Sequence, residues 1–360
     1  MSTSIRGDHD RALVRSRRVR ITAVGLSTAL ALVACGGGDE DSSGGEAEAL
    51  QPVTFLTNVP TESLTWTPEL IALTNGYFEE EGLDVTLQNV QGSPAGIQVV
   101  LADDALLVRP GDVDTMQAIA EQDAPIVSIG TVQHGGPTLR VVSSRTNPLD
   151  DPADFAGKLV GVGSTGGATK AALDLIMAAA GEDPEDLERQ VVGLSPGVFE
   201  LVRSGQLDGY VVSGDTALNL QMNEPDAVIF DPGTVMTAGS TNYVTSEEQA
   251  ADPEKQEQLR GYLRAITKAM EFVAADADDD YAATIEAISA EYDIATLDDP
   301  ELAVAALDFY VDSWTAGEGL VTTDPGAWQA AYDEAAAVGL VPAGLDPSEW
   351  LNQEFTPDGS

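Results

Sequence analysis

Short runs of apolar and β-branched residues alternate along the chain with segments whose apolar positions recur at helical spacing. Residues 53–57 (VTFLT) have the composition of a β-strand. In residues 68–81, Leu70, Ile71 and Phe78 fall on one face of an amphipathic helix. The predicted strands of this first unit are 53–57, 83–87, 105–108 and 125–132, and its helices are 68–81, a segment beginning at Ser93–Pro94, and 113–121. Such an alternation predicts a largely parallel sheet with helices on both faces.

A second α/β unit follows, and an acidic helical region completes the chain. The second unit has predicted strands at 158–162, 191–194, 209–213 and 227–230 and helices at 168–180, 198–204 and 215–222. The last region has predicted helices at 254–275, 280–291, 300–315 and 325–338. Two α/β units suggest a cleft between two lobes, because open α/β sheets bind ligands beyond the carboxyl ends of their strands.

The N-terminus has the pattern of an export signal. An arginine-rich stretch precedes the apolar run 21–33, and the end of the run leads into Cys35 as Leu32-Val33-Ala34-Cys35. As a helix the run would rise about 20 Å, too little for a hydrocarbon core of about 30 Å. The end of the run resembles a bacterial lipobox, which implies that residues 1–34 are removed and that Cys35 carries lipid. A buried free cysteine is the alternative, and export by the general or the twin-arginine route stays open. Residues 35–50, rich in Gly, Ser and acid, predict a flexible tether.

Charge and composition exclude several classes of function. The chain of 360 residues has 17 basic and 60 acidic residues, for a net charge of −43. Such a charge repels phosphate backbones and anionic lipid headgroups, which excludes nucleic-acid binding. Two histidines and one cysteine provide neither zinc-ligand spacing nor a disulfide, and no nucleophile elbow is present. We therefore expect no cofactor, no metal and no catalysis.

A glycine-rich turn at residues 161–166 (GVGSTG) matches the dinucleotide-binding fingerprint between a strand and a helix. The next predicted strand ends at Leu194-Ser195-Pro196 without the acidic residue that such a site requires. Two readings remain, a purely structural turn and a cradle for an anion or polar group at a helix N-terminus. The cradle would consist of Ser164, Thr165, Gly166, Gly167 and Thr169. The acidic run 276–280 lacks the glycine and glutamate of a calcium loop, since Tyr281 and Ala287 stand at those positions.

Four segments in order resemble the ABC-transporter solute-binding proteins of the taurine/nitrate/sulfonate and thiamine-pyrimidine group, which is the NMT1/THI5-like group. They are NGYFEEEGLDV (75–85), DFAGKLVGVG (154–163), AGEDP (180–184) and LVRSGQLDG (201–209). The resemblance covers residues 53–355 and implies a two-lobed α/β fold of the periplasmic-binding-protein type II, with a hinge and a central ligand cleft. Lobe 1 would combine 51–141 with 241–355, and lobe 2 would be 142–240. Crossover strands near 139–143 and 237–243 would form the hinge, and a ligand contacting both lobes would favour closure.

Within this frame, the pocket residues are those at the carboxyl ends of strands. Trp66 would stack on a planar ligand or pack inside its lobe. Arg109 would grip a carboxylate or sulfonate, or pair with Asp112 or Asp103. Asp215 would accept a hydrogen bond from a ligand amine or cap its helix. The candidates outside the cradle are Asn58, Trp66, Gly92, Ser93, Arg109, Ser213 and Asp215.

The resemblance implies a lipid-anchored monomer on the extracytoplasmic face of the cell membrane. Its function would be to capture a sulfonate- or nitrate-type anion, or a pyrimidine-like heterocycle, and to deliver it to an ABC permease. A tethered ligand sensor on the same fold is the alternative. A third possibility, an enzyme like the thiamine-pyrimidine synthase, would need a cysteine-rich iron motif, and this chain has a single cysteine.

Overall fold

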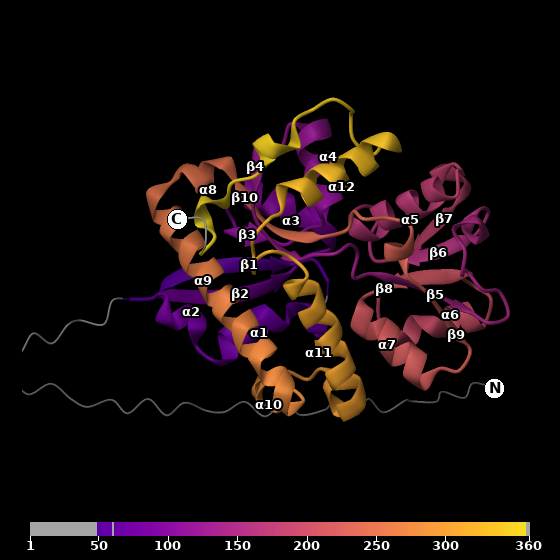
Figure 1. The fold of residues 1–360 in the computed structure, drawn as a ribbon, viewed down its shortest axis with the longest axis horizontal. Helices are drawn as coiled ribbons and strands as arrows, with labels where there is room; N and C mark the ends of the chain where they lie inside the picture. The colour runs from indigo at the N-terminus through magenta and orange to yellow at the C-terminus, as the bar shows by residue number, and fades with distance from the viewer. Residues whose placement is uncertain (1–48, 60, 358–360) are drawn as a thin grey trace, which may run out of the picture. The chain divides into compact units, whose positions relative to one another are not determined.

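The computed structural model describes residues 49–59 and 61–357, which form two lobes, each with its own five-stranded sheet (Figure 1). The two-lobed α/β fold expected from the sequence is confirmed. The predicted signal sequence, Cys35 and nearly all of the predicted tether lie outside the described residues.

The sheet of the first lobe has the strand order β2-β1-β3-β10-β4. Its strands are β1 Gln51–Thr57, β2 Leu83–Asn89, β3 Leu107–Val108, β4 Ile126–Gln133 and β10 Thr241–Ser246. Strands β1, β2 and β3 run parallel, whereas β10 runs antiparallel to β3 and β4. The sheet is therefore mixed, because its fourth strand in spatial order comes from the chain returning out of the second lobe.

Nine helices of the described chain accompany this sheet. They are α1 Thr67–Thr74, α2 Tyr77–Glu80, α3 Gly92–Leu101, α4 Asp112–Gln122, α8 Glu247–Ala251, α9 Pro253–Asp276, α10 Ala282–Glu291, α11 Pro300–Thr315 and α12 Pro325–Ala337. The single helix predicted over 68–81 is two helices, because Gly76 adopts a left-handed conformation (φ 71°) between them. The long helices α9, α11 and α12 each begin at an Asp-Pro pair whose aspartate accepts backbone N–H bonds of the first turn.

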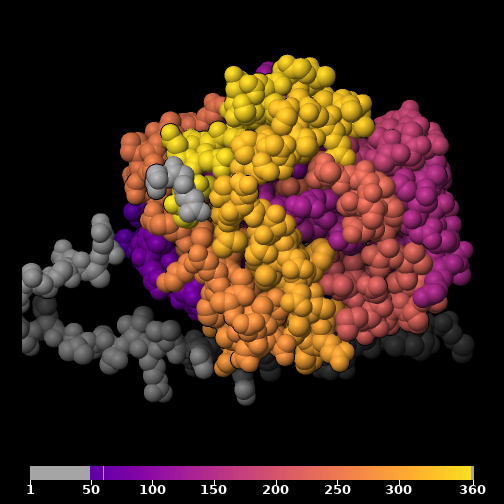
Figure 2. All heavy atoms as spheres, viewed as in Figure 1, coloured from indigo at the N-terminus to yellow at the C-terminus, as the bar shows by residue number. Residues whose placement is uncertain are grey.

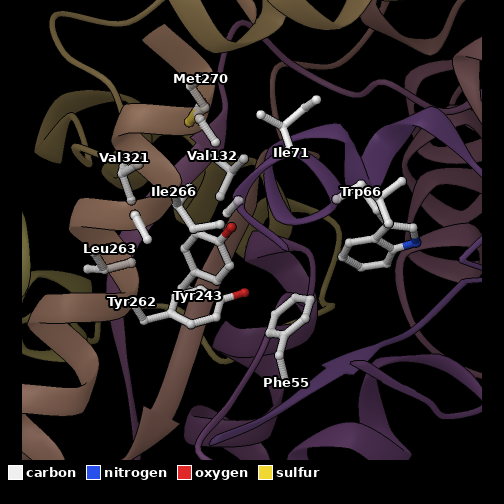
Figure 3. Close-up of a cluster of buried hydrophobic side chains, with 14 of the residues drawn as sticks. Phe55, Trp66, Ile71, Val132, Tyr243, Tyr262, Leu263, Ile266, Met270 and Val321 are labelled. Carbon is white, nitrogen blue, oxygen red and sulfur yellow. The ribbon is translucent and has the colours of Figure 1, made fainter. Parts of the chain in front are cut away.

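Aromatic side chains from distant segments pack together in the core of the first lobe (Figure 3). Phe55 of β1 contacts Trp66, Tyr243 of β10 and Tyr262 of α9, with ring centroids 5.6 to 5.9 Å apart. These contacts fix α9 and the segment before α1 against the sheet. They also set the position of Trp66, which lies at the edge of the cleft described below.

The sheet of the second lobe has the order β7-β6-β8-β5-β9. Its strands are β5 Arg140–Ser144, β6 Leu159–Val162, β7 Glu188–Val191, β8 Gly209–Val212 and β9 Ala227–Phe230, and its helices are α5 Ala168–Ala179, α6 Phe199–Arg203 and α7 Gly214–Asn223. Here β5 runs antiparallel to β8 and β9, so this sheet is also mixed. The strand predicted at 191–194 ends at Val191. Short 3-10 helices occur at Leu64–Trp66, Pro152–Phe155, Pro184–Asp186, Pro196–Val198, Pro232–Thr234, Ala277–Asp279, Ala295–Asp298, Pro347–Trp350 and Gln353–Phe355.

Two segments, 134–139 and 231–240, join the lobes, and they lie against one another. A Cβ atom on Gly239 (φ 118°) would stand 2.7 Å from the Cβ of Pro137, so only glycine fits there. Carboxylates of the first lobe hold the second segment. Asp112 accepts the N–H groups of Gly239 and Ser240, and Glu334 of α12 accepts those of Thr237 and Ala238.

Among the described residues, no helix is both long and apolar enough to cross a membrane.

Candidate ligand-binding cleft

Three neighbouring cavities of about 80, 360 and 300 Å³ lie between the lobes, and Val59 and Leu194 line all three. We call them the inner, outer and lateral cavities. The inner cavity is bounded by Trp66, Arg109 and the start of α4 on one side and by α5 on the other. In Figure 2 the lobes lie against each other along this region, with purple atoms of the N-terminal half visible between the orange helices and the second lobe. The inner and outer cavities adjoin, since they share the lining residues Asn58, Val59, Leu139, Ala168 and Leu194, and the outer one alone exceeds the roughly 150 Å³ that accommodates a benzene ring.

Arg109 follows β3 and is buried, with 2% of its surface exposed. Its Nη1 lies 3.0 and 3.2 Å from the two carboxylate oxygens of Glu69 on α1. Its Nη2 donates to the carbonyl (2.5 Å) and hydroxyl (3.1 Å) oxygens of Thr65. The predicted partners Asp112 and Asp103 are wrong, because the partner is Glu69, which sequence reasoning missed.

The pair formed by Arg109 and Glu69 is held on several sides. Tyr243 donates a 2.7 Å hydrogen bond to Glu69. Burial raises the pKa of Glu69, while the Arg109 charge and the Tyr243 bond act in the opposite direction. The guanidinium lies 4.1 Å from the ring centroid of Trp66, a cation–π contact. The positive charge is therefore compensated by groups of its own lobe.

Trp66 lines the inner cavity but exposes only 1% of its surface. Its ring contacts the guanidinium of Arg109 and, edge to face, the ring of Phe55, which lies near it in Figure 3. Trp66 therefore packs within its lobe, as the second alternative expected, and stacking on a ligand stays a prediction.

Gln133, at the end of β4, connects the floor of the cleft with the first crossover segment and with the start of β10. Its amide nitrogen donates to the Thr65 hydroxyl (3.1 Å), and its oxygen accepts from Thr138 and Thr241 (3.0 Å each). A glutamine at the end of a buried strand was not singled out in the sequence, because nothing local indicates which distant hydroxyls it meets.

Two buried aspartates at the start of α4 line the inner cavity, and neither was predicted as a site residue. Asp112 accepts N–H bonds from Val113, Gly239 and Ser240 at 2.7 to 3.1 Å. Burial nevertheless raises its pKa to about 7, because desolvation outweighs those bonds. The available sequence signal was two acids in the first turn of a helix that follows a strand end.

Asp114 differs from Asp112. Within the described part of the chain, no donor meets both the distance and the angle of a hydrogen bond to either of its oxygens. The Ser93 hydroxyl and the N–H groups of Gly111 and Ala168 are near enough to lower its pKa, but burial dominates and raises the pKa to about 6. Asp114 is thus a buried carboxyl beside the inner cavity whose two oxygens are almost fully enclosed.

Asn58, Gly92 and Ser93 lie together at the outer cavity. The Asn58 amide donates to the Ser93 hydroxyl (3.2 Å) and to the Arg109 carbonyl (3.0 Å). Gly92 (φ 79°) meets the second lobe, since a Cβ there would stand 2.6 Å from the hydroxyl of Ser164.

The predicted cradle is divided between the cleft and the surface. Ser164, Gly167 and Thr169 line the outer cavity. Thr165 is exposed and, like Gly166, lines none of the three cavities, although Gly166 faces Pro94 of the first lobe at 3.5 Å from its expected Cβ position.

Asp215 of α7 connects the second lobe to the first. Its carboxylate accepts from the Tyr310 hydroxyl (2.9 Å), the Ser63 hydroxyl (3.2 Å) and the Leu64 N–H (3.3 Å). The neighbouring Ser213 lines two cavities and donates to Thr216. Asp215 is therefore a bridge between the lobes.

Across residues 49–59 and 61–357, no group of His, Cys, Asp and Glu side chains is arranged to hold a metal ion.

Comparison with known proteins relates the chain to small-molecule-binding proteins. It is 26% identical over 251 residues to a formylaminopyrimidine-binding protein of Halalkalibacterium halodurans, covering 67% of this chain and 72% of the relative. It is 21% identical over 356 residues to the riboflavin-binding protein RibY of Chloroflexus aurantiacus, covering 95% and 99%. The fold matches that of the alkanesulfonate-binding protein SsuA of Xanthomonas axonopodis pv. citri, with a TM-score of 0.63 and 16% identity over 85% of this chain and 98% of that one.

A family match supports the same relationship. Residues 64–279 match the family described as NMT1/THI5 like. The matched segment includes Trp66, Arg109 and Asp114, the start of α5 and the bridge residue Asp215, and it extends over more than half of the chain. The chain therefore belongs to the NMT1/THI5-like family.

Proposed function

We propose that this protein is the solute-binding component of an ABC importer, held by a lipid on Cys35 at the extracytoplasmic face of the membrane. It captures one small metabolite between its lobes and presents it to a membrane permease. Family membership and two relatives that bind a formylaminopyrimidine and riboflavin support the binding role.

The observation that carries the proposal is the set of adjoining cavities between two lobes that already touch. Asp215 accepts hydrogen bonds across the gap from Ser63, Leu64 and Tyr310. A ligand that contacts both walls adds differential free energy in favour of the closed state, and a permease that separates the lobes would release it.

The cleft favours a heterocycle over an anion. Arg109 is the cation lining the inner cavity, and Glu69 compensates its charge. Asp112 and Asp114 line the same cavity, so a sulfonate or nitrate there would approach two buried acids. Much of the remaining lining is apolar, including Val113, Leu139, Leu175 and Leu194, which suits the faces of a planar ring.

Ligand recovery tests the proposal. The full chain, expressed in a bacterium that makes the metabolite, should release one small molecule per chain on denaturation, identified by mass spectrometry, and that compound should rebind 1:1 by calorimetry. Ala168→Trp, which fills the junction of the inner and outer cavities, should abolish this binding. Ala179→Trp, on the exposed end of the same helix, should leave it unchanged. Chemical conversion of the ligand would instead indicate an enzyme.

The anchor has a separate test. Cys35→Ser should release the protein from the membrane fraction or leave an uncleaved precursor, because acylation requires the thiol. Unchanged processing and membrane retention would refute lipidation while leaving the binding role intact. A tethered sensor remains the alternative to transport, and permease and ATPase genes beside the coding sequence would favour transport.

A further inference from the structure

We propose that the lobes bend about two touching pivots, Gly135–Gly136 and Met236–Thr237, and that Glu334 is the positioning residue that fixes the second pivot. The inference rests on the proposed capture of a ligand between lobes that open and close. It adds where the chain bends and which residue outside the cleft sets that position.

Glu334 lies on α12, and its carboxylate binds the second crossover segment. It accepts the N–H (3.0 Å) and the hydroxyl (2.9 Å) of Thr237 and the N–H of Ala238 (2.7 Å). Glu334 lines none of the three cavities of the cleft. The bonds of this carboxylate therefore lead to the crossover segment and not to a ligand in the cleft.

Asp112 continues the same clamp over the next two residues. It accepts the N–H groups of Gly239 (3.0 Å) and Ser240 (3.1 Å), and its own N–H donates to the Ser240 carbonyl (2.9 Å). The four consecutive N–H groups of residues 237–240 thus donate to two carboxylates of the first lobe. Because hydrogen bonds to a carboxylate are strong, this part of the segment moves with that lobe.

The part of the segment before the clamp is bonded within itself and to the second lobe. Asp231 pairs with Arg140, the first residue of β5, at 3.2 Å. The Met236 N–H donates to the Pro232 carbonyl (3.0 Å). The hydrogen-bond partners of the backbone therefore change from the second lobe to the first between Met236 and Thr237.

The first crossover segment changes partners at two glycines. Before them, the N–H of His134 donates to a carbonyl of α11 in the first lobe (2.8 Å). After them, Arg140 of the second lobe donates to the Pro137 carbonyl (2.9 Å). Gly135 and Gly136 between these bonds have φ values of 75° and 100°. Glycine adopts such conformations at no steric cost, and a hinge needs only a few residues that absorb the change in backbone angles.

The two changes of partner lie side by side. A Cβ atom built on Gly136 would stand 3.7 Å from the carbonyl oxygen of Thr237 and 3.8 Å from that of Met236. Two pivots in contact define one axis, so the lobes can rotate without stretching either segment. One hydrogen bond spans the first pivot, from Thr138 to Gln133 (3.0 Å), and we expect it to break when the lobes open.

The position of the second pivot depends on Glu334. Without its carboxylate, residues 237 and 238 would join the bend, and more open arrangements would become accessible to the ligand-free chain. The closed fraction then falls, and the apparent affinity of a ligand that needs closed lobes falls with it.

Two measurements on the ligand-free full chain test the clamp, and neither depends on the identity of the ligand. In Glu334→Ala the amides of residues 237 and 238 should exchange about 10- to 100-fold faster by hydrogen-exchange mass spectrometry, while β10 stays protected. Small-angle scattering should give a greater radius of gyration than the wild type. Glu334→Gln keeps one acceptor oxygen and should show smaller changes. Asp333→Ala, which removes an exposed carboxylate from the same helix, should show none.

The first pivot has its own variant, Gly136→Ala. No atom outside its chain neighbours lies closer than 3.7 Å to the added methyl group, so the variant acts through its backbone conformation. The closed arrangement becomes the strained one, and the ligand-free chain should have a greater radius of gyration. Gly344→Ala is the control, because Gly344 has a φ of 88° but lies outside both crossover segments, and its radius should be unchanged. This pair keeps the test decisive if Glu334→Ala does not fold.

The outcomes separate the pivots from the proposed function. Wild-type radii in both Glu334→Ala and Gly136→Ala would overturn the inference, and so would faster exchange spread evenly over the first lobe, which indicates general loosening. Recovery of a ligand at 1:1 beside wild-type radii would leave the binding role standing while the pivots are refuted. The expected changes in both variants, with no ligand recovered, would support the pivots and count against the binding role.

Discussion

The region around Arg109 and the region around Asp114 face the same cavity, yet they differ in how far their polar atoms are already paired. Arg109 makes four hydrogen bonds, to Glu69 and Thr65, and lies over Trp66. Asp114 is buried to a similar degree and has no fully formed hydrogen bond to a described residue. The polar atoms of the first arrangement are paired within the lobe, whereas the carboxylate oxygens of the second are enclosed without a fully formed hydrogen bond.

This difference shows why charge alone is a poor guide to a binding residue. In a chain with 17 basic and 60 acidic residues, an arginine at a strand end attracts attention, but here it stabilises its own lobe. The buried group whose oxygens lack a fully formed hydrogen bond, Asp114, is one acid among many. Arg109 and Asp114 are distinguished by how far their donors and acceptors are paired, and only the fold reveals this pairing.

The largest expected effect of a single substitution on stability comes from breaking the buried ion pair between Arg109 and Glu69. Glu69→Gln keeps the shape of the side chain but leaves the buried Arg109 without its countercharge, and loss of one partner of a buried pair typically costs about 3–5 kcal/mol. We expect a decrease of this size in the free energy of unfolding, measured by urea denaturation. Glu200→Gln, which removes one partner of the exposed Arg203, should change it by less than about 1 kcal/mol. An equally small effect at Glu69 would mean that the pair contributes little and that Arg109 is available to a ligand.

The two buried aspartates at the start of α4 predict that the stability of the fold depends on pH. Burial raises the pKa of Asp112 to about 7 and that of Asp114 to about 6, both above the usual 3.8. Between pH 4 and 7 the folded chain therefore holds protons that the unfolded chain has released. Their contribution to stability is complete below about pH 4 and is lost as the pH rises through 6 and 7.

Between pH 4.5 and 7.5 this effect is about 5 kcal/mol for the two groups together, since each pH unit over which only the folded chain holds a proton corresponds to about 1.4 kcal/mol. The free energy of unfolding, measured with urea from pH 4.5 to 7.5, should fall more steeply with pH in the wild type than in the double variant Asp112→Asn, Asp114→Asn. The exposed carboxylates are the same in both proteins, so the difference isolates the two buried groups. Parallel profiles would show that these groups titrate normally.

The order of strands and helices was readable from the sequence because apolar spacing is local. Which strands run antiparallel was not, since β5 and β10 take their direction from the chain crossing between lobes. The break at Gly76 was missed because a glycine inside an apolar helical pattern is tolerated as often as it ends the helix.

For the site, the sequence placed Asn58, Ser93, Ser164 and Thr169 at strand ends and loops, and the structure brings them to the outer cavity. It did not indicate Asp114. The groups that surround an acid in the first turn of a helix come from segments elsewhere in the chain, here Ser93 at the start of α3 and Ala168 at the start of α5. For the same reason Glu69, forty residues before Arg109, was not recognised as its partner.

The smallest expected effect concerns the bridge between the lobes. Asp215→Ala removes the acceptor for Ser63, Leu64 and Tyr310, and its cost should be about 1–2 kcal/mol, because hydroxyl groups released at a cleft can bind water. The larger consequence is conformational, since these bonds exist only while the lobes touch. Small-angle scattering of the ligand-free variant should give a greater radius of gyration than the wild type. Asp226→Ala, at an exposed position of the same lobe, should leave the radius unchanged.

A steric variant distinguishes loss of the bridge from a general loosening of α7. A Cβ on Gly214 would stand 2.1 Å from the ring of Phe309 on α11, so Gly214→Ala forces either the ring or the lobe to move while Asp215 is retained. If the contact between α7 and α11 limits opening, both variants should expand the ligand-free protein, and saturating ligand should restore the compact form in Asp215→Ala more completely than in Gly214→Ala. This order follows because a ligand can replace lost attraction between the lobes but cannot remove a clash. Equal radii for the wild type and both variants would show that ligand-free closure depends on other contacts, such as that of Gly92 with Ser164.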